Sequence, residues 1–194
     1  MLSRGTRCIR IDGTMKKTLL LLTLLTTITI AKNNVEIIHG HTLPPEPDPV
    51  VNNATLLGVD SNDNGVRDDV ERWIYHTYKD KHPIHLDIAM QGARAWQKVL
   101  EDPTKAKEIH DEVSAPIYCE GYFTVCVNAE SQNLYQLERI TSSGKFVKII
   151  FNTVERWNAY IQYDTLLSGD SYTIPWCSES KQLCDFNTSK YEER

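Results

Sequence analysis

The sequence lacks the features that would mark a membrane protein, a nucleic-acid binder or a familiar enzyme. No run of eighteen apolar residues occurs in the 194-residue chain, which disfavours a conventional membrane-spanning helix. Basic residues are in the minority, 21 against 26 acids for a formal charge of −5, whereas nucleic-acid binding needs a basic face. The patterns H-E-x-x-H, G-x-S-x-G, C-x-x-C-H, G-x-G-x-x-G and the P-loop are missing. With 41% hydrophobic and 24% charged residues, the composition is typical of a soluble globular protein.

The first 31 residues have the pattern of an export signal. Lys16 and Lys17 precede a fourteen-residue stretch from Thr18 to Ala31 that is mostly Leu, Thr and Ile, which is typical of a secretory signal peptide. Met15 stands directly before the lysines and is a possible true start. An uncleaved anchor or a core helix is the alternative. Cleavage after residue 31 would remove five of the 21 basic and one of the 26 acidic residues, leaving 163 residues with a net charge of −9. We therefore expect a periplasmic or extracellular protein.

Cysteines are few, and their spacing predicts disulfide bonds. Cys8 lies in the signal segment, and the other four are Cys119, Cys126, Cys177 and Cys184. An even number in an exported chain is typical of disulfides. Zinc is the weaker alternative, because metal knuckles usually place cysteines two to four residues apart. If residues 119–126 are helical, their rise of about 10.5 Å exceeds the roughly 7 Å reach of a bridge, so the bonds would join the two segments. A loop there would allow local bonds.

Residues 60–71 fit the calcium-loop pattern D-x-[DN]-x-[DN]-G-x₅-E at every specified position. Calcium takes six to eight hard oxygen ligands, and the glycine at position 6 permits the sharp turn of such a loop. We expect an affinity of roughly 10⁻⁴–10⁻³ M, as in extracellular modules, and a mainly structural role for the ion. An Asx-rich turn that caps a helix without an ion is the alternative. The candidate ligands are the side chains of Asp60, Asn62, Asn64, Asp68 and Glu71 and the backbone carbonyl of Val66.

This loop resembles the calcium loops of EF-hands, dockerins and thrombospondin type 3 repeats. Arg67 stands at position 8, where a paired EF-hand usually has an apolar residue, and the chain has no second loop. The upstream prolines also disfavour the incoming helix of an EF-hand. The resemblance covers about twelve to twenty residues and implies bound calcium without catalytic activity. The rest of the mature chain resembles secreted bacterial proteins, which adds no function. The thrombospondin type 3 pattern D-x-[DN]-x-[DN]-G-V-x-D is matched more closely, at Asn62, Asn64, Gly65, Val66 and Asp68.

The predicted fold is mostly α, a small helical bundle entered by an extended Pro-rich arm and a single calcium loop. Prolines at 44, 45, 47 and 49 favour extended chain in the arm, residues 32–59, and argue against a helix there. Helical apolar spacing predicts helices from residue 68, over 84–101, after Asp102-Pro103 and over 145–167. Pro116 should end or kink the third. The calcium loop and helices thus occupy residues 60–169, and 170–194 form an irregular cysteine-containing tail.

The aromatic and histidine residues are interpreted conservatively. The two histidines at 39 and 41 can bind a transition metal, but a solvated pair is the expectation. His82 and His85 flank a proline at a helix start, where capping or surface exposure is expected. Trp176 is less periodic and is a candidate for exposure. We expect core packing for the tryptophans on apolar helical stripes, Trp73, Trp96 and Trp157.

The leading functional hypothesis is an exported, non-enzymatic calcium-binding protein that contacts an envelope protein or a surface polymer. It predicts an exposed apolar or aromatic patch outside the core. A secreted or periplasmic, hydrolase-like enzyme with a structural calcium is the alternative, and it needs a pocket of convergent groups such as His110 with Glu112 or Glu120. A structural spacer module is a further alternative and predicts an extended shape. No catalytic residue, nucleic-acid partner or membrane span after signal removal is predicted.

Overall fold

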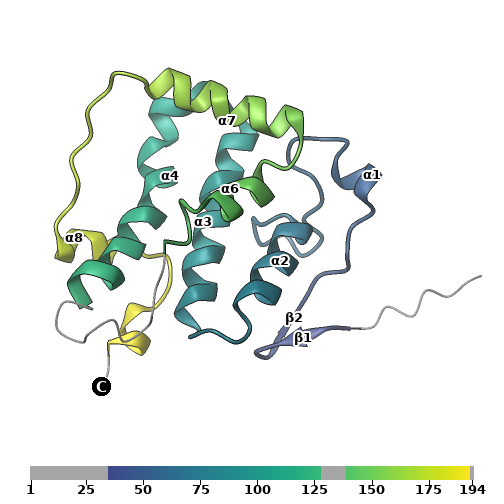
Figure 1. Ribbon diagram of the computed structural model, residues 1–194, viewed down its shortest axis with the longest axis horizontal. Coiled ribbons are helices and arrows are strands. Elements are labelled where there is room, and N and C mark those ends of the chain that lie inside the picture. Colours follow the sequence, from purple (N-terminus) through teal and green to yellow (C-terminus); the bar gives the residue numbers. More distant parts are fainter. Residues whose placement is uncertain (1–34, 128–138, 193–194) are drawn as a thin grey trace, which may run out of the picture. The chain divides into compact units, whose positions relative to one another are not determined.

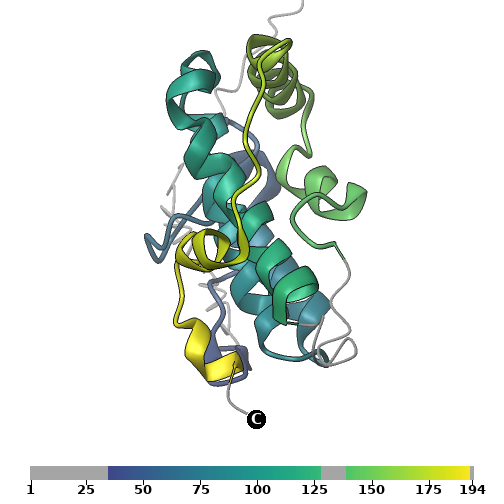
Figure 2. The same cartoon turned by 90° about the vertical axis from the view of Figure 1, so that its left-hand side faces the viewer.

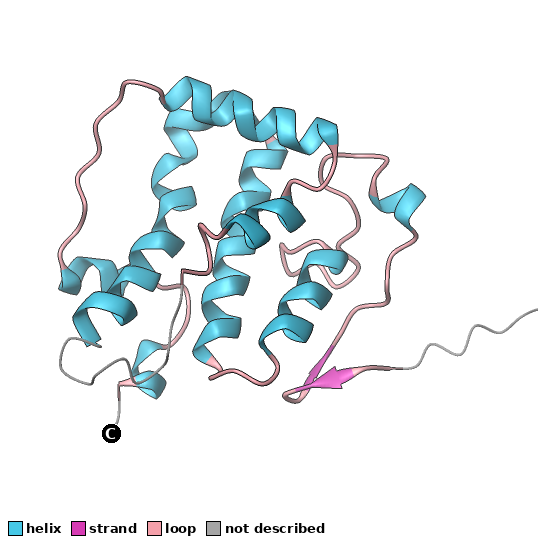
Figure 3. Ribbon diagram, in the orientation of Figure 1, coloured by secondary structure: helices cyan, strands magenta, loops and turns pink. Residues whose placement is uncertain are grey.

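Helix α3 (Ile84–Glu101) lies at the centre of the fold in the computed structural model, which describes residues 35–127 and 139–192. Twelve of its residues are buried and they occur all round the helix, as expected for a helix enclosed by others. The described chain is mostly helical, as predicted (Figure 3). The predicted signal segment lies outside the described residues. The helices that contact α3 are α2 (Asp68–Tyr78), α4 (Ala106–Gly121), α6 (Gly144–Ile150) and α7 (Val154–Leu167) (Figure 1).

Shorter elements complete the described chain. Strands β1 (Ile37–Ile38) and β2 (His41–Thr42) form an antiparallel hairpin, with Ile37 opposite Thr42. A π-helix, η2 (Tyr122–Val127), extends α4. The other elements are α1 (Pro49–Asn52), the 3₁₀ helices η1 (Pro103–Lys105) and η3 (Thr188–Tyr191), and α8 (Cys177–Gln182).

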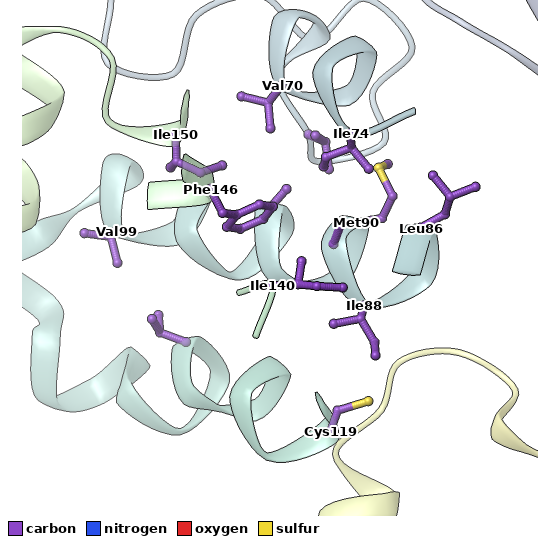
Figure 4. Close-up of a cluster of buried hydrophobic side chains, with 14 of the residues drawn as sticks. Val70, Ile74, Leu86, Ile88, Met90, Val99, Cys119, Ile140, Phe146 and Ile150 are labelled. Carbon is purple, nitrogen blue, oxygen red and sulfur yellow. The ribbon is translucent and has the colours of Figure 1, made fainter. Parts of the chain in front are cut away.

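The core fills the space between α3 and its neighbours. Figure 4 shows apolar side chains from α2, α3, α4 and α6 meeting in one cluster. Trp73 and Trp96 pack against this core, as predicted. Trp157 was expected in the core but is 44% exposed, and Trp176 is 81% exposed. Fully buried members from the four helices are Ile74, Ile88, Cys119 and Phe146.

Helix α3 has its predicted bounds, but the single helix predicted over 145–167 is wrong. It breaks after Ile150, and α7 begins after Thr153, whose hydroxyl accepts a hydrogen bond from the N–H of Arg156 (3.2 Å). The break resets the helical phase, so the apolar residues Val154 and Ile161 are exposed. Pro116 does not end its helix, because α4 continues to residue 121.

The Pro-rich arm is less extended than predicted. It contains the β1–β2 hairpin and the short helix α1, which begins at Pro49. Proline is tolerated in a first helical turn because its missing N–H would have no partner there. The carboxylate of Asp48 accepts hydrogen bonds from two N–H groups of that turn (2.8 and 3.2 Å). The arm is also attached to α2, since the guanidinium of Arg72 binds Glu36, Glu46 and the carbonyl of Pro44 at 2.6–2.9 Å.

Two disulfides join the end of α4 to the C-terminal segment. Cys119 pairs with Cys184 and Cys126 with Cys177, at Cα–Cα distances of 5.0 and 5.8 Å. The first cysteine of each bond lies in the continuous helical stretch α4–η2, and both bonds join the two segments, as expected for a helical 119–126. Disulfides form and persist in oxidising, exported environments. None of the helices within residues 35–127 and 139–192 has the length and apolar content needed to cross a bilayer.

Candidate metal centre

The loop before α2 curls around the carboxylate of its first residue. Oδ1 of Asp60 accepts a hydrogen bond from the N–H of Asn64 (3.2 Å), and Oδ2 accepts one from Gly65 (2.8 Å). The side-chain oxygen of Asn64 accepts one from the N–H of Val66 (2.8 Å). Asp63 and Gly65 have φ values of 56° and 79°, a left-handed conformation that glycine adopts at least cost. Gly65 therefore makes the sharp turn that the sequence pattern requires.

Glu71, at the last position of the loop, lies where several groups converge. Its side chain is fully buried, and Oε2 accepts hydrogen bonds from the amides of Asn64 (2.7 Å) and Asn62 (3.2 Å). Oε1 lies 2.5 Å from Nε2 of His41, whose ring stacks on Tyr75. Loop positions 3, 5 and 12 are thus brought together. The β1–β2 hairpin of the arm therefore contacts the same carboxylate, through His41.

Asp68 and Val66 are the remaining candidate ligands, and both are buried. Oδ1 of Asp68 accepts a hydrogen bond from the N–H of Ser61 (2.9 Å). Burial raises the pKa of this carboxyl above its ordinary value, the Ser61 hydrogen bonds oppose the shift, and the charges of Asp60 and Glu71 add to it. The neighbouring charges of Asp60 and Glu71 therefore disfavour a third negative charge, on Asp68.

The carboxylates of Asp60, Asp68 and Glu71 accept hydrogen bonds from different N–H groups. Among the described residues, no three His, Cys, Asp or Glu side chains form a group that could hold a metal ion. The predicted ligand set contains only three such side chains, Asp60, Asp68 and Glu71, and its other members are two amides and a backbone carbonyl. Every one of these groups carries a hard oxygen, the kind of ligand that calcium takes. The donor set therefore suits calcium in its chemistry.

Arg67, at loop position 8, attaches the loop to the end of α6. The side chain is almost fully buried, and the guanidinium donates to the carbonyls of Ile149 (2.9 Å) and Ile150 (3.1 Å). Asp69 pairs with the same guanidinium at 2.5 Å. A cation is favourable at a helix C-terminus, where carbonyls lack helical partners. Position 8 of a paired EF-hand usually makes an apolar contact. Here Arg67 instead caps the C-terminal end of α6.

Arg156 performs a similar role for the arm. Its fully buried guanidinium donates to the carbonyls of Asn52 (2.6 Å), Thr55 (3.0 Å) and Leu56 (2.9 Å) and to the side-chain oxygens of Asn53 (3.0 Å) and Asn152 (2.6 Å). Burial lowers the pKa of Arg156 to about 10, and the neighbouring arginine adds to the shift. The group stays charged at neutral pH, and it holds the chain that leads into the loop.

Gly58 lies where these two arginines approach the arm, and its replacement by Ala is expected to destabilise the protein. Its φ is +69°, and an added Cβ would overlap Cδ of Arg67 and lie 2.9 Å from Nη2 of Arg156. Left-handed strain and overpacking together predict a loss of about 2–5 kcal/mol of unfolding free energy. Gly40→Ala is the matched control, since Gly40 has φ +78° but no atom within 4 Å of the added Cβ. If urea melts showed equal losses of unfolding free energy for the two variants, contact of the added Cβ with the two arginines would contribute nothing to the loss.

The acid–base cluster considered for a hydrolase is not assembled in the described residues. Nδ1 of His110 lies 3.2 Å from the hydroxyl of Tyr163. Glu112 instead pairs with a lysine of α3 at 2.9 Å. Glu120 is buried, and its carboxylate accepts hydrogen bonds from the backbone N–H groups of residues 140 and 141. The three side chains therefore serve different contacts.

The paired histidines also have separate partners. Nε2 of His39 lies 2.5 Å from the carbonyl of Lys79, whereas His41 contacts Glu71. Nδ1 of His85 lies 2.9 Å from the carbonyl of His82 at the start of α3. His82 is exposed, as expected, and its Nδ1 accepts a hydrogen bond from the N–H of Ile84 (3.4 Å), whereas His85 is buried.

Comparison of the chain with known protein families, with curated proteins and with solved structures found no match.

Proposed function

We propose that the protein is an exported calcium-binding protein in which the ion is mainly structural. The observation that supports this most is the convergence of loop positions 3, 5 and 12 on buried Glu71, in a loop curled around Asp60. Asn62 and Asn64 carry an oxygen beside the nitrogen that now donates, so both can supply ligand oxygens. Bound calcium would offset the charge of the three carboxylates. It would also tie the arm to α2, because His41 of the hairpin contacts the same glutamate.

The interaction role in this proposal is supported by exposed apolar side chains. Contiguous apolar surface outside a core is characteristic of interaction sites. We propose the periplasm or the extracellular space as the location, with an envelope component as the partner. A hydrolase with structural calcium remains the alternative, although His110, Glu112 and Glu120 do not converge. A spacer role is less well supported, because the arm packs on α2. Exposed side chains around one pocket are Ile117, Val125, Ile174 and Trp176.

Calcium titration of the chelator-treated protein tests the proposal. We expect one-site binding by calorimetry and a higher melting temperature. At a calcium concentration one hundred times the Kd, the stabilisation should be about 2.7 kcal/mol, a shift of about 5–10 °C for a chain of this size. Magnesium at the same concentration should shift the melt less, because it dehydrates reluctantly and needs near-ideal octahedral geometry.

Three variants make the test specific. Asp60→Asn and Glu71→Gln keep the side-chain shapes but remove ligand charge, so both should reduce or abolish the calcium-dependent shift. Asp63→Asn removes the same charge from the exposed position 4 of the loop, which is not a predicted ligand, and should retain the shift. Millimolar calcium with neither heat nor a melting shift would contradict the proposal. Residues 60–71 would then be a helix-capping turn.

A further inference from the structure

A pocket of about 500 Å³ lies where α4, η2 and α8 meet, and this volume is typical of small-molecule sites. Figure 1 shows α2 and its loop on one side of α3, and α4 with the yellow α8 on the other. Figure 2 shows α8 and η3 from that side. The walls are largely apolar and exposed: Val125 is 67%, Ile174 78% and Trp176 81% exposed.

The pocket is held open by covalent and helical structure. Cys126 and Cys177 both line it, and the disulfide between them joins its two walls. Cys119–Cys184 makes a second link between the same two segments. Helices α4, η2 and α8 form much of the walls, and backbone groups within helices bond one another; none of the described residues that line the pocket lies in a β-strand.

Among the described residues that line the pocket, Arg139 is the one cation. The carboxylate of Glu120 is occupied by two backbone N–H groups and the hydroxyl of Thr141 (2.6 Å). The hydroxyls of Thr124 and Ser180 donate to backbone carbonyls (3.0 and 3.2 Å). Arg139 is exposed and makes no ion pair with any residue in the described ranges, although its charge opposes the rise that burial causes in the pKa of Glu120. The hydroxyls of Tyr118 and Ser142 also line the pocket.

We propose that this pocket binds an anionic amphiphile, an acyl chain with a carboxylate head group. Val125, Ile174 and Trp176 would cover the chain, and Arg139 would pair with the carboxylate. Charge complementarity supports this class, because Arg139 is the one cation among the described residues that line the pocket, and the carboxylate of Glu120 is already occupied by hydrogen-bond donors. The inference rests on the proposed interaction role but does not depend on calcium.

Titration with sodium laurate below its micellar concentration tests this site. The buffer contains a chelator, because calcium precipitates fatty acids, and Trp fluorescence and calorimetry report binding. We expect saturable binding of one equivalent. Arg139→Gln should weaken laurate about three- to tenfold and leave the neutral analogue dodecanol unaffected. Lys148→Gln is the matched control, since Lys148 is also an exposed cation without an ion-pair partner among the described residues but does not line this pocket.

Val125→Asp, at an exposed position, should abolish binding of both laurate and dodecanol while the circular dichroism spectrum stays unchanged. Absence of saturable laurate binding, or equal weakening by Arg139→Gln and Lys148→Gln, would overturn the proposal. A concentration-dependent dimer that Val125→Asp dissociates would instead make this face an interface between two copies, and would also overturn it. The calcium-dependent shift of the melting temperature depends on the loop and laurate binding depends on the pocket, so failure of either proposal is visible without the other.

Discussion

Replacing Arg156 by Met is expected to lower the free energy of unfolding by about 3–5 kcal/mol. Met fills much of the same volume but donates no hydrogen bond. It would leave the carbonyls of residues 52, 55 and 56 without the donor that now orders them. Arg156 is 0% exposed, so water does not readily replace its guanidinium as a hydrogen-bond donor. Each carbonyl left without a donor therefore costs more free energy than it would at the surface. Urea-induced unfolding followed by circular dichroism gives the change directly.

Two further variants show whether geometry or charge is responsible. Arg156→Lys keeps the charge but replaces a planar fork with a point donor, so it should recover only part of the lost stability. Lys145→Met removes an exposed cation on α6 and should change stability by less than about 0.5 kcal/mol. If Arg156→Met unfolded at the same urea concentration as the parent protein, the carbonyl contacts would contribute no net stability.

The arm should respond more than the helices to the loss of Arg156. Its described contacts with the body are mostly polar, made by Arg156, Arg72 and His41. We therefore expect faster amide exchange over residues 50–58 in Arg156→Met than in the parent, and little change in α3. This link between α7 and the approach to the loop would also make calcium binding weaker in the variant.

The spacing of apolar residues predicted a helix correctly where one helical pattern continues over its whole length. Helix α3 has an uninterrupted apolar period and a Pro at its start, and the structure gives it the predicted bounds. The start of α2 at Asp68 and the turn at Asp102-Pro103 follow from capping and dipole rules that act within a few residues. A helical 119–126 excludes local disulfides by distance, so the sequence predicted bonds between the two segments but not which of the two possible pairings forms.

Contacts between residues far apart in the sequence were not predictable from spacing. The break between α6 and α7 coincides with carbonyls that Arg67 binds from more than eighty positions away. Arg156 reaches the arm across about one hundred residues, and its residue type alone suggests a solvated surface cation. His41 contacts Glu71 from thirty positions away. The candidate ligands follow from the loop pattern, whereas the groups that hold the loop in place follow only from the tertiary structure.

Removing both disulfides is expected to cost more stability than the two single removals combined. The bonds are nested, because Cys126–Cys177 lies within the loop closed by Cys119–Cys184. Sequence separations of 51 and 65 each predict about 4 kcal/mol from loop-closure entropy when a bond acts alone. With one bond in place, the second closes only the ring formed by 119–126 and 177–184, about fifteen residues, which predicts about 3 kcal/mol.

Each single-bond variant, with one cysteine pair replaced by Ala, should therefore lose about 3 kcal/mol, and the variant without either bond about 7 kcal/mol. That total is a large part of the 5–15 kcal/mol typical of a native protein, so the doubly substituted chain should be close to unfolded at 37 °C. Cys119 is fully buried and Cys177 is exposed, so loss of the Cys119–Cys184 pair should add a small cavity term. Urea unfolding of the three variants measures all these values. Strict additivity would mean that the reduced chain retains structure near α4 and α8 and that loop entropy does not determine the stabilisation.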